Sequence, residues 1–376
     1  MSKSKTVYIA LGSNQGDKFN NLQLAVNKIH ESIGSIRGLS RIYTTPAMGF
    51  EGNDFYNACI KVDTFLTPHK ILSLLLTIEK KLGRLPSTKG LYESRCIDLD
   101  MLLFEEDVLE TKNLVIPHRE MHNRLFVLQP LNEIAKSVVH PILHSTIEEL
   151  LEVCIDDSNI SIVNQELQNP MKVFDFSLYN YIAIEGNIGA GKTSLATQMS
   201  RDFNAKLILE RFADNPFLPK FYKEPQRYAF TLEMSFLADR YQQISDDLSQ
   251  LDLFKDFIVS DYDVFKSLIF SKITLPEDEF MLYRKLFYQV YKDIAKPDLY
   301  VYLYQNTERL QQNIKKRGRK YEKDIQDEYL DSINSGYIEF LKNHPEFNVK
   351  IIDISNKDFI KNRDDYLWVL DQICLV

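Results

Sequence analysis

Residues 181–196 read YIAIEGNIGAGKTSLA, and this stretch decides the fold of the second half of the chain. An apolar run typical of a buried strand is followed by Gly186, four further residues and Gly191-Lys192-Thr193, after which the residues favour a helix. Strand, loop and helix in this order are typical of a phosphate-binding loop, whose backbone N–H groups and helix N-terminus hold phosphate oxygens. We expect Lys192 to neutralise the outer phosphates and the Thr193 hydroxyl to ligate Mg²⁺.

Several residues of this loop are expected to contact a bound nucleotide. They are Gly186, Asn187, Gly189, Gly191, Lys192 and Thr193. The competing interpretation is a glycine-rich turn without a ligand, which the strand before the loop and the helix after it disfavour.

The loop begins late in a chain of 376 residues, although such a unit usually opens a domain. A chain of this length exceeds the size at which one hydrophobic core keeps growing, so we expect two domains. The polar composition of residues 156–171 indicates a linker, although residues 160–163 would also suit an edge strand. The expected ranges are 1–160 for the first domain, 161–178 for the linker and 179–376 for the second domain.

Composition limits the class of partner. Acidic residues outnumber basic ones in both halves, and the formal net charge of −8 argues against a nucleic-acid or anionic-membrane partner. The four cysteines stand apart without a metal-ligand spacing, which is typical of reduced thiols in a cytoplasmic protein. Neither a signal peptide nor an apolar run of membrane-spanning length is recognisable, so we expect a cytoplasmic protein that acts on small molecules.

The first half alternates strands and helices. Strands are expected at about residues 7–11, 37–44, 55–65 and 97–104, and helices at about residues 19–33 and 68–82. Pro68 suits the first turn of the second helix, where its missing N–H costs no hydrogen bond. The order of these elements, βαββαβ, predicts a ferredoxin-like α+β sandwich.

Two carboxylates on the last of these strands, Asp98 and Asp100, are candidates for chemistry. Residues two apart on a strand face the same way, so both lie on one face while Ile97, Leu99 and Met101 lie on the other. Carboxylates ~7 Å apart along a strand can converge on Mg²⁺ ions that also hold nucleotide phosphates. An exposed acidic strand face would produce the same pattern, and the pair alone does not decide between the two interpretations.

Several motifs occur together in this half: residues 10–14 (ALGSN), 43–46 (YTTP), 54–57 (DFYN), 78–84 (IEKKLGR), 95–100 (RCIDLD) and 116–118 (IPH). Over residues 6–160 the chain thereby resembles 6-hydroxymethyl-7,8-dihydropterin pyrophosphokinase. The resemblance implies transfer of a pyrophosphoryl group from ATP to the hydroxymethyl group of the pterin, which is a step of folate synthesis.

The resemblance also implies roles for single residues. Asp98 and Asp100 would hold two Mg²⁺ ions between the substrates. The pterin pocket would be formed by Thr45, Pro46, Met48, Phe55, Asn57 and Phe126. ATP and the transferring phosphates would be bound by Glu79, Arg84, Arg95, His118 and Arg124, of which Arg84 and Arg95 would act in catalysis. Pro86 stands where the family tends to place a second arginine, and Tyr92 stands where some members have tryptophan.

The second half also alternates strands and helices. Further strands are expected at about residues 205–210, 256–261, 297–303 and 349–353, and a long helix at about residues 226–249. This order predicts a parallel, doubly wound α/β sheet. Glu210 lies at the carboxyl end of a strand, where open α/β sheets bind substrates, and is a candidate general base. The basic residues 313–322 suit a lid over a triphosphate, although a solvated helix end would have the same composition.

The motifs of this half are residues 186–193, Glu210-Arg211, residues 215–219 (NPFLP), 228–230 (YAF), Arg240 and residues 317–322 (RGRKYE). Over residues 179–376 the chain thereby resembles the deoxynucleoside kinases. By this resemblance Glu210 would take the proton from the 5′-hydroxyl, and Glu322 would touch the sugar. Arg317 and Arg319 would stabilise charge on the γ-phosphoryl group. ATP and Mg²⁺ are implied as cofactors, and a homodimer is implied through this half.

Two residues depart from that family's pattern. Tyr262 follows Asp261 where the family usually has an arginine, so the arginine expected to pair with Glu210 is missing. Glu233 stands where a glutamine commonly reads the base, and it is assigned to the substrate site together with Tyr228. A carboxylate accepts hydrogen bonds but cannot donate them, so Glu233 would favour a base edge that offers N–H groups.

The leading hypothesis is a bifunctional transferase with two separate ATP-dependent reactions. One alternative keeps only the pterin pyrophosphokinase active and makes the phosphate-loop domain a nucleotide-binding or dimerisation module. Another is a nucleotide-dependent switch. It is disfavoured because the second half has no Asp-x-x-Gly motif and residues 356–358 do not match Asn-Lys-x-Asp.

Overall fold

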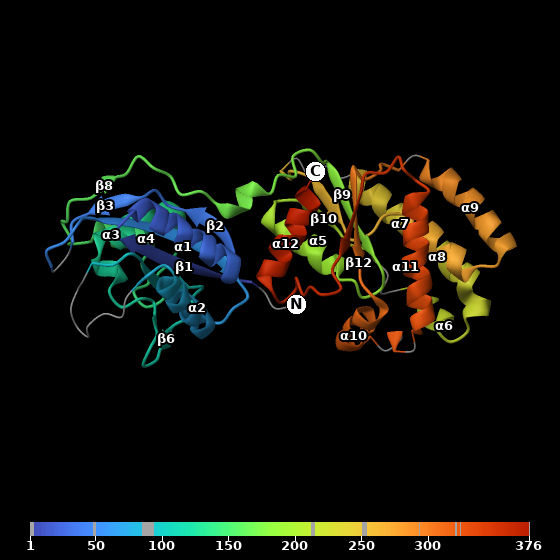
Figure 1. Cartoon of the computed structure of the whole chain (residues 1–376), viewed down its shortest axis with the longest axis horizontal. Helices are drawn as coiled ribbons and strands as arrows, with labels where there is room; N and C mark the ends of the chain where they lie inside the picture. The colour runs from blue at the N-terminus through green and yellow to red at the C-terminus, as the bar shows by residue number, and fades with distance from the viewer. Residues whose placement is uncertain are drawn as a thin grey trace. The chain divides into compact units, whose positions relative to one another are not determined.

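The computed structural model describes residues 4–47, 50–84, 94–211, 215–249, 254–292, 294–319, 322–323 and 325–375. It divides into two units, Met1–Val173 and Phe174–Val376 (Figure 1). The division falls inside residues 161–178, the range expected to link two domains. The positions with a predicted role that lie outside the described residues are Met48, Pro86 and Tyr92.

The first unit is built on an antiparallel sheet. Its strands are β1 (Lys5–Ser13), β2 (Ser35–Leu39), β3 (Tyr43–Thr45), β4 (Phe55–Thr64), β5 (Asp98–Phe104) and β8 (Ser161–Ile162). They follow the order β5-β1-β4-β3-β8, and β2 also pairs with β4. A separate hairpin consists of β6 (Leu109–Glu110) and β7 (Val115–Ile116). β8 lies within residues 160–163, where the sequence is compatible with either a linker or an edge strand.

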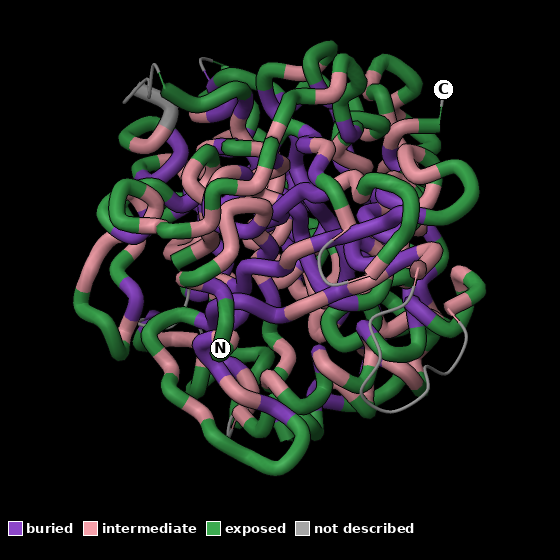
Figure 2. The backbone as a smooth tube through the Cα atoms, turned by 90° about the vertical axis from the view of Figure 1, so that its left-hand side faces the viewer, coloured by how far each residue is buried: buried purple, intermediate pink, exposed green. Residues whose placement is uncertain are grey.

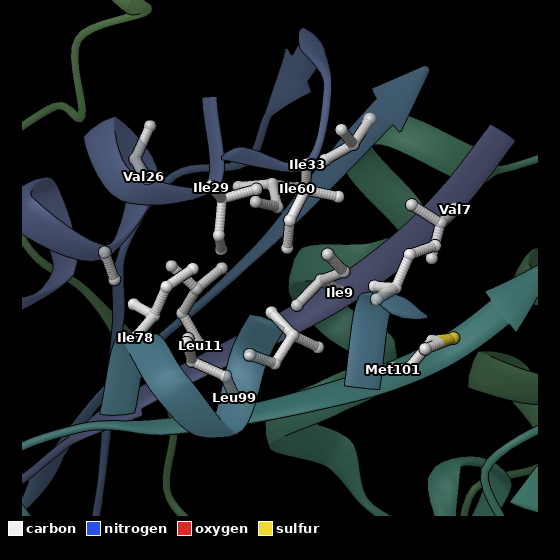
Figure 3. Packing of buried hydrophobic residues seen from close by; sticks show 14 of the residues in the cluster. Val7, Ile9, Leu11, Val26, Ile29, Ile33, Ile60, Ile78, Leu99 and Met101 are labelled. Carbon is white, nitrogen blue, oxygen red and sulfur yellow. The ribbon is translucent and has the colours of Figure 1, made fainter. Parts of the chain in front are cut away.

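Helices pack on both faces of this sheet. They are α1 (Lys18–Ser32), α2 (Pro68–Lys81), α3 (Leu125–Ala135) and α4 (Ile147–Glu152), with 3₁₀ turns η1 (Met121–Asn123) and η2 (Pro170–Val173). Because side chains alternate along β1, Val7, Ile9 and Leu11 pack with α1 and α2 (Figure 3). Tyr8 lies on the opposite face and packs with α3. The unit therefore buries apolar side chains on both faces of its sheet.

The single strand expected at residues 37–44 is instead two strands, β2 and β3. Between them the N–H of Cys59 on β4 donates to the Ser40 hydroxyl oxygen at 2.9 Å. The N–H of Arg41 donates to a carboxylate oxygen of Glu133 on α3 at 2.8 Å. These side chains take over backbone hydrogen bonds and thereby interrupt the strand.

The sequence does not predict helix α3. Its N-cap residue, Arg124, makes no capping hydrogen bond through its side chain, and Pro130 lies inside the helix. The usual signals for the start and the continuation of a helix are therefore absent.

The second unit is a parallel sheet with the phosphate loop at the end of its central strand. Its strands are β9 (Tyr181–Gly186), β10 (Lys206–Ile208), β11 (Ile258–Ser260), β12 (Leu299–Tyr304) and β13 (Val349–Asp353). They follow the order β10-β11-β9-β12-β13, and the neighbouring strands are parallel. β9 is buried along its whole length, as expected for a strand covered on both faces.

Helices alternate with these strands. They are α5 (Lys192–Asp202), α6 (Leu218–Phe221), α7 (Pro225–Ser249), α8 (Lys266–Thr274), α9 (Glu277–Tyr291), α10 (Thr307–Arg317), α11 (Asp327–Lys342) and α12 (Arg363–Cys374). Helices α5 and α12 lie on one side of the sheet, and α7, α8 and α11 lie on the other (Figure 1). This arrangement confirms the predicted parallel α/β architecture of the second half.

β10 is shorter than the sequence predicts, because it ends before Glu210. The N–H of Glu210 donates to Oδ1 of Asp261 at 2.7 Å and not to a neighbouring strand. Asp261 directly follows β11. The two acidic residues therefore leave the sheet next to each other.

Strands β5, β9 and β12 are largely buried. Figure 2 shows buried segments in the interior and exposed segments around them. Fully buried tyrosines are frequent in the second unit, and they include Tyr262, Tyr283, Tyr302 and Tyr337. In the part of the chain that the structure describes, no helix has the length and apolar character needed to cross a bilayer.

Candidate active sites

A cavity of about 600 Å³ lies beside β1, β4 and β5 in the first unit. Most of the residues that the sequence assigns to this half line it. They are Thr45, Pro46, Phe55, Asn57, Glu79, Arg84, Arg95, Asp98, Asp100, Arg124 and Phe126. These residues come from separate strands, helices and loops, so the fold gathers side chains that are far apart in the sequence.

Asp98 and Asp100 lie on one face of β5 and line this cavity. Asp98 is paired with two arginines. Its Oδ1 lies 2.6 Å from Nη1 of Arg84, and its Oδ2 lies 2.7 Å from Nη1 of Arg95. Burial and then the charge of Asp98 raise the pKa of Asp100. Both carboxylates thus face a partly buried site, which disfavours a simple solvated acidic face.

The two carboxylates suit Mg²⁺. This ion prefers few protein carboxylates together with phosphate oxygens and water. Two neighbouring carboxylates in one partly buried site repel each other, and a divalent cation would relieve that repulsion. Among the described residues no group of three or more His, Cys, Asp or Glu side chains could hold a metal ion. A metal ion between Asp98 and Asp100 would therefore depend on substrate phosphates for its remaining ligands.

Glu79 on α2 orients one of these arginines. Its Oε1 accepts the N–H of Leu99 at 2.8 Å and also contacts Nη1 of Arg84. Burial raises the pKa of Glu79 to about 7, against the opposing effect of Arg84. Since Arg84 also contacts Asp98, Glu79 links helix α2 to the charged end of the cavity.

The other part of the cavity is aromatic and neutral. Phe55 and Phe126 line it, and Nδ2 of Asn57 donates to Oγ1 of Thr45 at 2.8 Å. Phe50, which the sequence analysis did not single out, also lines it and meets Phe55 edge to face, with ring centroids 6.3 Å apart. Such a surface suits a flat heteroaromatic ring with polar edges.

His118 is not among the residues that line this cavity. Its backbone N–H donates to the carbonyl oxygen of Leu102 at 2.9 Å, and its Nδ1 accepts the N–H of Glu120 at 3.2 Å. Burial lowers the pKa of His118, and the carboxylate of Asp100 opposes this shift. His118 therefore lies within electrostatic range of Asp100 without lining the cavity.

In the second unit, the lysine of the phosphate loop forms hydrogen bonds with the backbone of the same loop. Gly189 and Gly191 have φ angles of +86° and +90°, in the left-handed region that favours glycine. Nζ of Lys192 donates to the carbonyl oxygens of Gly186 and Asn187, each at 2.9 Å. Burial is the main cause that lowers the pKa of Lys192 to about 8.

Uncharged amide side chains support this loop from behind. Nδ2 of Asn187 donates to Oδ1 of Asn334 on α11 at 2.9 Å. Nδ2 of Asn313 on α10 donates to the carbonyl oxygen of Gly189 at 3.0 Å and to Oε1 of Gln305 at 2.9 Å. Nδ2 of Asn334 donates to the carbonyl oxygen of Gln305 at 3.0 Å, which closes the amide network. The side chain of Asn187, expected to contact nucleotide, is thus fully buried and supports the loop.

A second cavity, of about 120 Å³, lies against the phosphate loop. The predicted site residues that line it are Gly189, Lys192, Thr193, Glu210, Glu233, Arg317, Arg319 and Glu322. Residues that line it without having been predicted as site residues include Asp261, Arg240 and Lys266. Tyr228 does not line it. Its ring packs at the edge of the core, 5.3 Å from the guanidinium carbon of Arg227.

Thr193 is held by Asp261. The Thr193 hydroxyl donates to Oδ2 of Asp261 at 2.5 Å, and Oδ1 of Asp261 accepts the N–H of Glu210 at 2.7 Å. Asp261 therefore connects the start of α5 to Glu210, which follows β10. The Thr193 hydroxyl is a hard oxygen of the kind that Mg²⁺ prefers.

Glu210 has two cationic partners, although position 262 holds a tyrosine and not the arginine of the family pattern. Its Oε1 lies 2.9 Å from Nε and 2.7 Å from Nη2 of Arg240, and its Oε2 lies 2.7 Å from Nζ of Lys266. Burial alone would raise the pKa of Glu210, but the charges of Lys266 and Arg240 outweigh burial and hold that pKa below its usual range. Both partners come from helices that the sequence pattern does not place beside Glu210.

Glu233 on α7 has one oxygen without a partner. Its Oε1 accepts the hydroxyl of Thr274 at 3.0 Å, whereas the buried Oε2 has no hydrogen-bond partner among the described residues. Burial raises the pKa of Glu233 to about 7. Since a buried polar atom without a partner is costly, Oε2 is a candidate acceptor for a ligand N–H group.

Arg317 and Arg319 converge on Glu322. Oε2 of Glu322 lies 2.5 Å from Nη2 of Arg317, and Oε1 lies 3.2 Å from Nη1 of Arg319. Both arginine side chains are only 33% exposed and line the cavity. This disfavours the interpretation of the basic segment as a solvated helix end.

The second unit is a parallel α/β unit with a phosphate loop, and the cavity of the first unit carries paired aspartates. Together these features define an enzyme of the kinase type. The family model described as deoxynucleoside kinase matches residues 182–375, and the one described as 7,8-dihydro-6-hydroxymethylpterin-pyrophosphokinase matches residues 8–136. The chain belongs to both families, with one in each half. Kinase families use ATP as the phosphate donor, so the chain is an ATP-dependent transferase.

Relatives of each half are known separately. A deoxyguanosine kinase of Bacillus subtilis (strain 168) is 37% identical over 190 residues, which cover 50% of this chain and 92% of the relative. A 2-amino-4-hydroxy-6-hydroxymethyldihydropteridine pyrophosphokinase of Aquifex aeolicus is 37% identical over 145 residues, which cover 38% of this chain and 89% of the relative. A solved structure of deoxyadenosine kinase from M. mycoides, 24% identical, covers 51% of this chain and 98% of its own, with a TM-score of 0.45.

Proposed function

We propose that the chain catalyses two separate transfers from ATP. The first unit transfers a pyrophosphoryl group to the hydroxymethyl group of 6-hydroxymethyl-7,8-dihydropterin, a step of folate synthesis. The second unit transfers the γ-phosphoryl group to the 5′-hydroxyl of a deoxynucleoside. The observation that carries the proposal is that each unit has its own cavity, and each cavity joins phosphate-binding cations to a separate surface for the acceptor. The alternative with one active unit and one binding module is not favoured.

In the first unit, the charged and the aromatic parts of one cavity suit the two substrates. The pterin ring would lie against Phe55 and Phe126, with Asn57 and Thr45 available for its polar edge. Arg84, together with Arg95 and Arg124, would hold the phosphates. Mg²⁺, held by Asp98 and Asp100, would supply positive charge at the transferring phosphates. The rate would then come from in-line positioning and charge neutralisation, without a covalent intermediate. The order of the antiparallel strands supports a ferredoxin-like description of this unit.

In the second unit, Glu210 would accept the proton of the 5′-hydroxyl as this oxygen attacks phosphorus. Lys192 would bind the outer phosphates, and Thr193 would ligate Mg²⁺, which would neutralise phosphate charge. Arg317 and Arg319 would leave Glu322 in part and face the γ-phosphoryl group, and Glu322 would turn to the sugar. These movements are proposed because all three side chains already line the same cavity.

Glu233 supports a purine with N–H donors as the base. The edge of guanine offers N–H groups, whereas a carboxylate facing an acceptor-rich edge would find no partner. The relative from B. subtilis is named deoxyguanosine kinase. We therefore place deoxyguanosine first among the candidate nucleosides.

We expect this preference to depend on pH through Glu233. With a pKa of about 7, the carboxyl group loses its proton as the pH rises from 6 to 8, and only the carboxylate accepts two N–H groups. The KM for deoxyguanosine should therefore fall about tenfold over this range. The ratio of the KM values for deoxyguanosine and deoxyadenosine, measured at each pH, removes pH effects common to both substrates. In Glu233→Gln this ratio should be constant with pH. A wild-type ratio that stays constant would contradict the assignment of Glu233.

For the pterin pocket, we expect Asn57→Ala to raise the KM for the pterin about tenfold, because a buried hydrogen-bonding group is lost and Thr45 loses its donor. The kcat should change less, since the arginines and aspartates stay in place. Initial rates at varied pterin concentration measure both constants. Asn113→Ala, at an exposed position of the same unit, is the matched control. An unchanged KM in Asn57→Ala would exclude Asn57 from the pocket.

The proposed function can be tested with the full chain in one assay, because the two reactions release different nucleotides from ATP. The purified protein is incubated with Mg-ATP and either the pterin or one of the four deoxynucleosides, and the products are separated by chromatography. Pyrophosphoryl transfer must yield AMP and the pterin diphosphate ester, whereas phosphoryl transfer must yield ADP and a deoxynucleoside monophosphate. Absence of AMP with the pterin would reject the first assignment. Absence of ADP formation with every deoxynucleoside would reject the second.

We also infer, from the resemblance to deoxynucleoside kinases, that the second unit forms a homodimer. Light scattering coupled to size-exclusion chromatography of the full chain would test this, with a mass of twice 43.9 kDa expected. A monomer at micromolar concentration would reject it.

A further inference from the structure

Lys266 is a buried lysine that the sequence motifs did not single out. It opens helix α8, and its side chain is 10% exposed. Its ammonium nitrogen lies 2.7 Å from Oε2 of Glu210 and 5.5 Å from the ring centroid of Phe270. It also lines the cavity beside the phosphate loop, together with Lys192.

Hydrogen bonds tie Lys266 to the phosphate loop. The N–H of Lys266 donates to the carbonyl oxygen of Asp263 at 3.3 Å, and the N–H of Asp263 donates to Oε1 of Glu185 at 2.6 Å. Oδ2 of Asp263 accepts the N–H of Phe265 at 3.2 Å. Glu185 belongs to β9, directly before Gly186. The start of α8 is therefore fixed relative to the strand that carries the loop.

The two oxygens of Glu210 are held by two different helices. Arg240 on α7 binds Oε1, and Lys266 on α8 binds Oε2. Nη1 of Arg240 also donates to the hydroxyl of Ser267, the residue after Lys266, at 2.7 Å. Two cations surround one carboxylate, so the cluster of Glu210, Arg240 and Lys266 has a net positive charge next to the phosphate-binding lysine.

We propose that Lys266 is a positioning residue for phosphoryl transfer: its ammonium group fixes the carboxylate of Glu210 within the cavity and provides the cation that the buried Tyr262 cannot provide. This inference rests on the proposed nucleoside kinase function. Tyr262 is fully buried and uncharged, so position 262 offers Glu210 no positive charge. Lys266 follows Tyr262 by four residues, at the start of α8, and its ammonium group contacts the carboxylate of Glu210.

Lys266 and Glu210 would have the same contacts if their ion pair only stabilised the fold. The two interpretations differ in the effect that they predict for the loss of Lys266. If Lys266 only stabilised the fold, its loss would lower the midpoint of thermal unfolding without a selective loss of kcat in the folded enzyme. If it positions Glu210, the folded variant must bind both substrates and turn over slowly, because the proton acceptor is misplaced.

The test compares Lys266→Met, Lys266→Gln and Lys266→Arg in the full chain. Methionine keeps the length and apolar stem without the charge, glutamine keeps a hydrogen-bond donor, and arginine restores the charge. Steady-state kinetics with Mg-ATP and deoxyguanosine, or whichever deoxynucleoside the wild type phosphorylates, give kcat and both KM values. Circular dichroism reports folding. Lys272→Met on the same helix, whose ammonium pairs with Glu339 at 2.8 Å on the surface, is the matched control.

We expect kcat to fall about 100-fold in Lys266→Met and Lys266→Gln, with both KM values within about threefold of the wild type. Lys266→Arg should recover at least a tenth of the wild-type kcat, and Lys272→Met should match the wild type. If Lys266→Met does not fold, Lys266→Gln and Lys266→Arg carry the comparison. A wild-type kcat in either uncharged variant would overturn the inference, and so would an arginine variant as slow as the glutamine variant.

Failure of this inference and failure of the proposed function give different results. A wild-type chain that phosphorylates no deoxynucleoside rejects the proposed function itself. A wild-type chain that is active, with Lys266→Met equally active, rejects only the role of Lys266.

Discussion

Lys192→Ala is expected to lower kcat/KM for deoxynucleoside phosphorylation about 1,000-fold, because the variant loses the cation that we propose faces the transferred phosphoryl group. Nζ of Lys192 also donates to the carbonyl oxygens of Gly186 and Asn187, so the same change removes two hydrogen bonds that shape the loop. Pterin pyrophosphorylation should stay within twofold of the wild type, since Lys192 belongs to the other unit. The measurement is the rate of ADP formation with deoxynucleoside beside the rate of AMP formation with pterin, on one preparation.

Lys342→Ala, at an exposed position on α11, is the matched control for the loss of a lysine. Both rates should be unchanged in this variant. If Lys192→Ala phosphorylates deoxynucleosides at the wild-type rate, the phosphate loop does not bind the donor, and the nucleoside kinase assignment fails. If it loses both activities, the preparation must be checked for unfolding before either assignment is judged.

Asp98→Asn is expected to have the opposite selectivity: kcat/KM for the pterin falls about 1,000-fold, and deoxynucleoside phosphorylation is unchanged. Asparagine keeps the shape of the side chain but removes the charge that Arg84 and Arg95 contact at 2.6 and 2.7 Å. The variant therefore leaves two guanidinium groups without their carboxylate and weakens the proposed Mg²⁺ site. AMP formation with pterin at several Mg²⁺ concentrations measures the effect.

Asp107→Asn is the matched control, because Asp107 forms an exposed ion pair with Lys5 at 2.9 Å, outside the cavity. It should retain both activities. Excess Mg²⁺ should recover part of the pterin activity in Asp98→Asn if the aspartate holds the ion. A wild-type rate in Asp98→Asn would show that the pair on β5 does not take part in the reaction.

Local patterns predicted the parts of the fold that depend on neighbouring residues. The phosphate loop follows from the order of strand, glycines and helix around Gly186, and β13 begins and ends where the sequence places it. Helix α3 could not be predicted, since its capping signal is absent and it contains Pro130. The break between β2 and β3 depends on Glu133, which is remote in sequence from Arg41. The periodicity of apolar residues along the chain gives no information about such contacts between distant residues.

The candidate site shows the same limit. Asp98 and Asp100 could be named from their spacing on one strand, because the two residues are neighbours on one face. The partners of Glu210 are 30 and 56 residues away, on α7 and α8. No pattern in the sequence connects Glu210 to Lys266, and the tyrosine at position 262 does not indicate that a lysine four residues later pairs with Glu210. The unpaired oxygen of Glu233 also required the structure.

The amide network behind the phosphate loop has a consequence for how the second unit responds to its surroundings. Four of its side chains are asparagine or glutamine: Asn187, Gln305, Asn313 and Asn334. The hydroxyl of the buried Tyr302 also donates to Oδ1 of Asn334, at 3.1 Å. Amides neither gain nor lose protons near neutral pH and carry no net charge for salt to screen. Changes in acidity and ionic strength therefore leave these amides uncharged, but they act on Lys192, whose ammonium group also holds the carbonyl oxygens of Gly186 and Asn187. The support that the loop receives from Lys192 responds to pH, and the support from the amides does not.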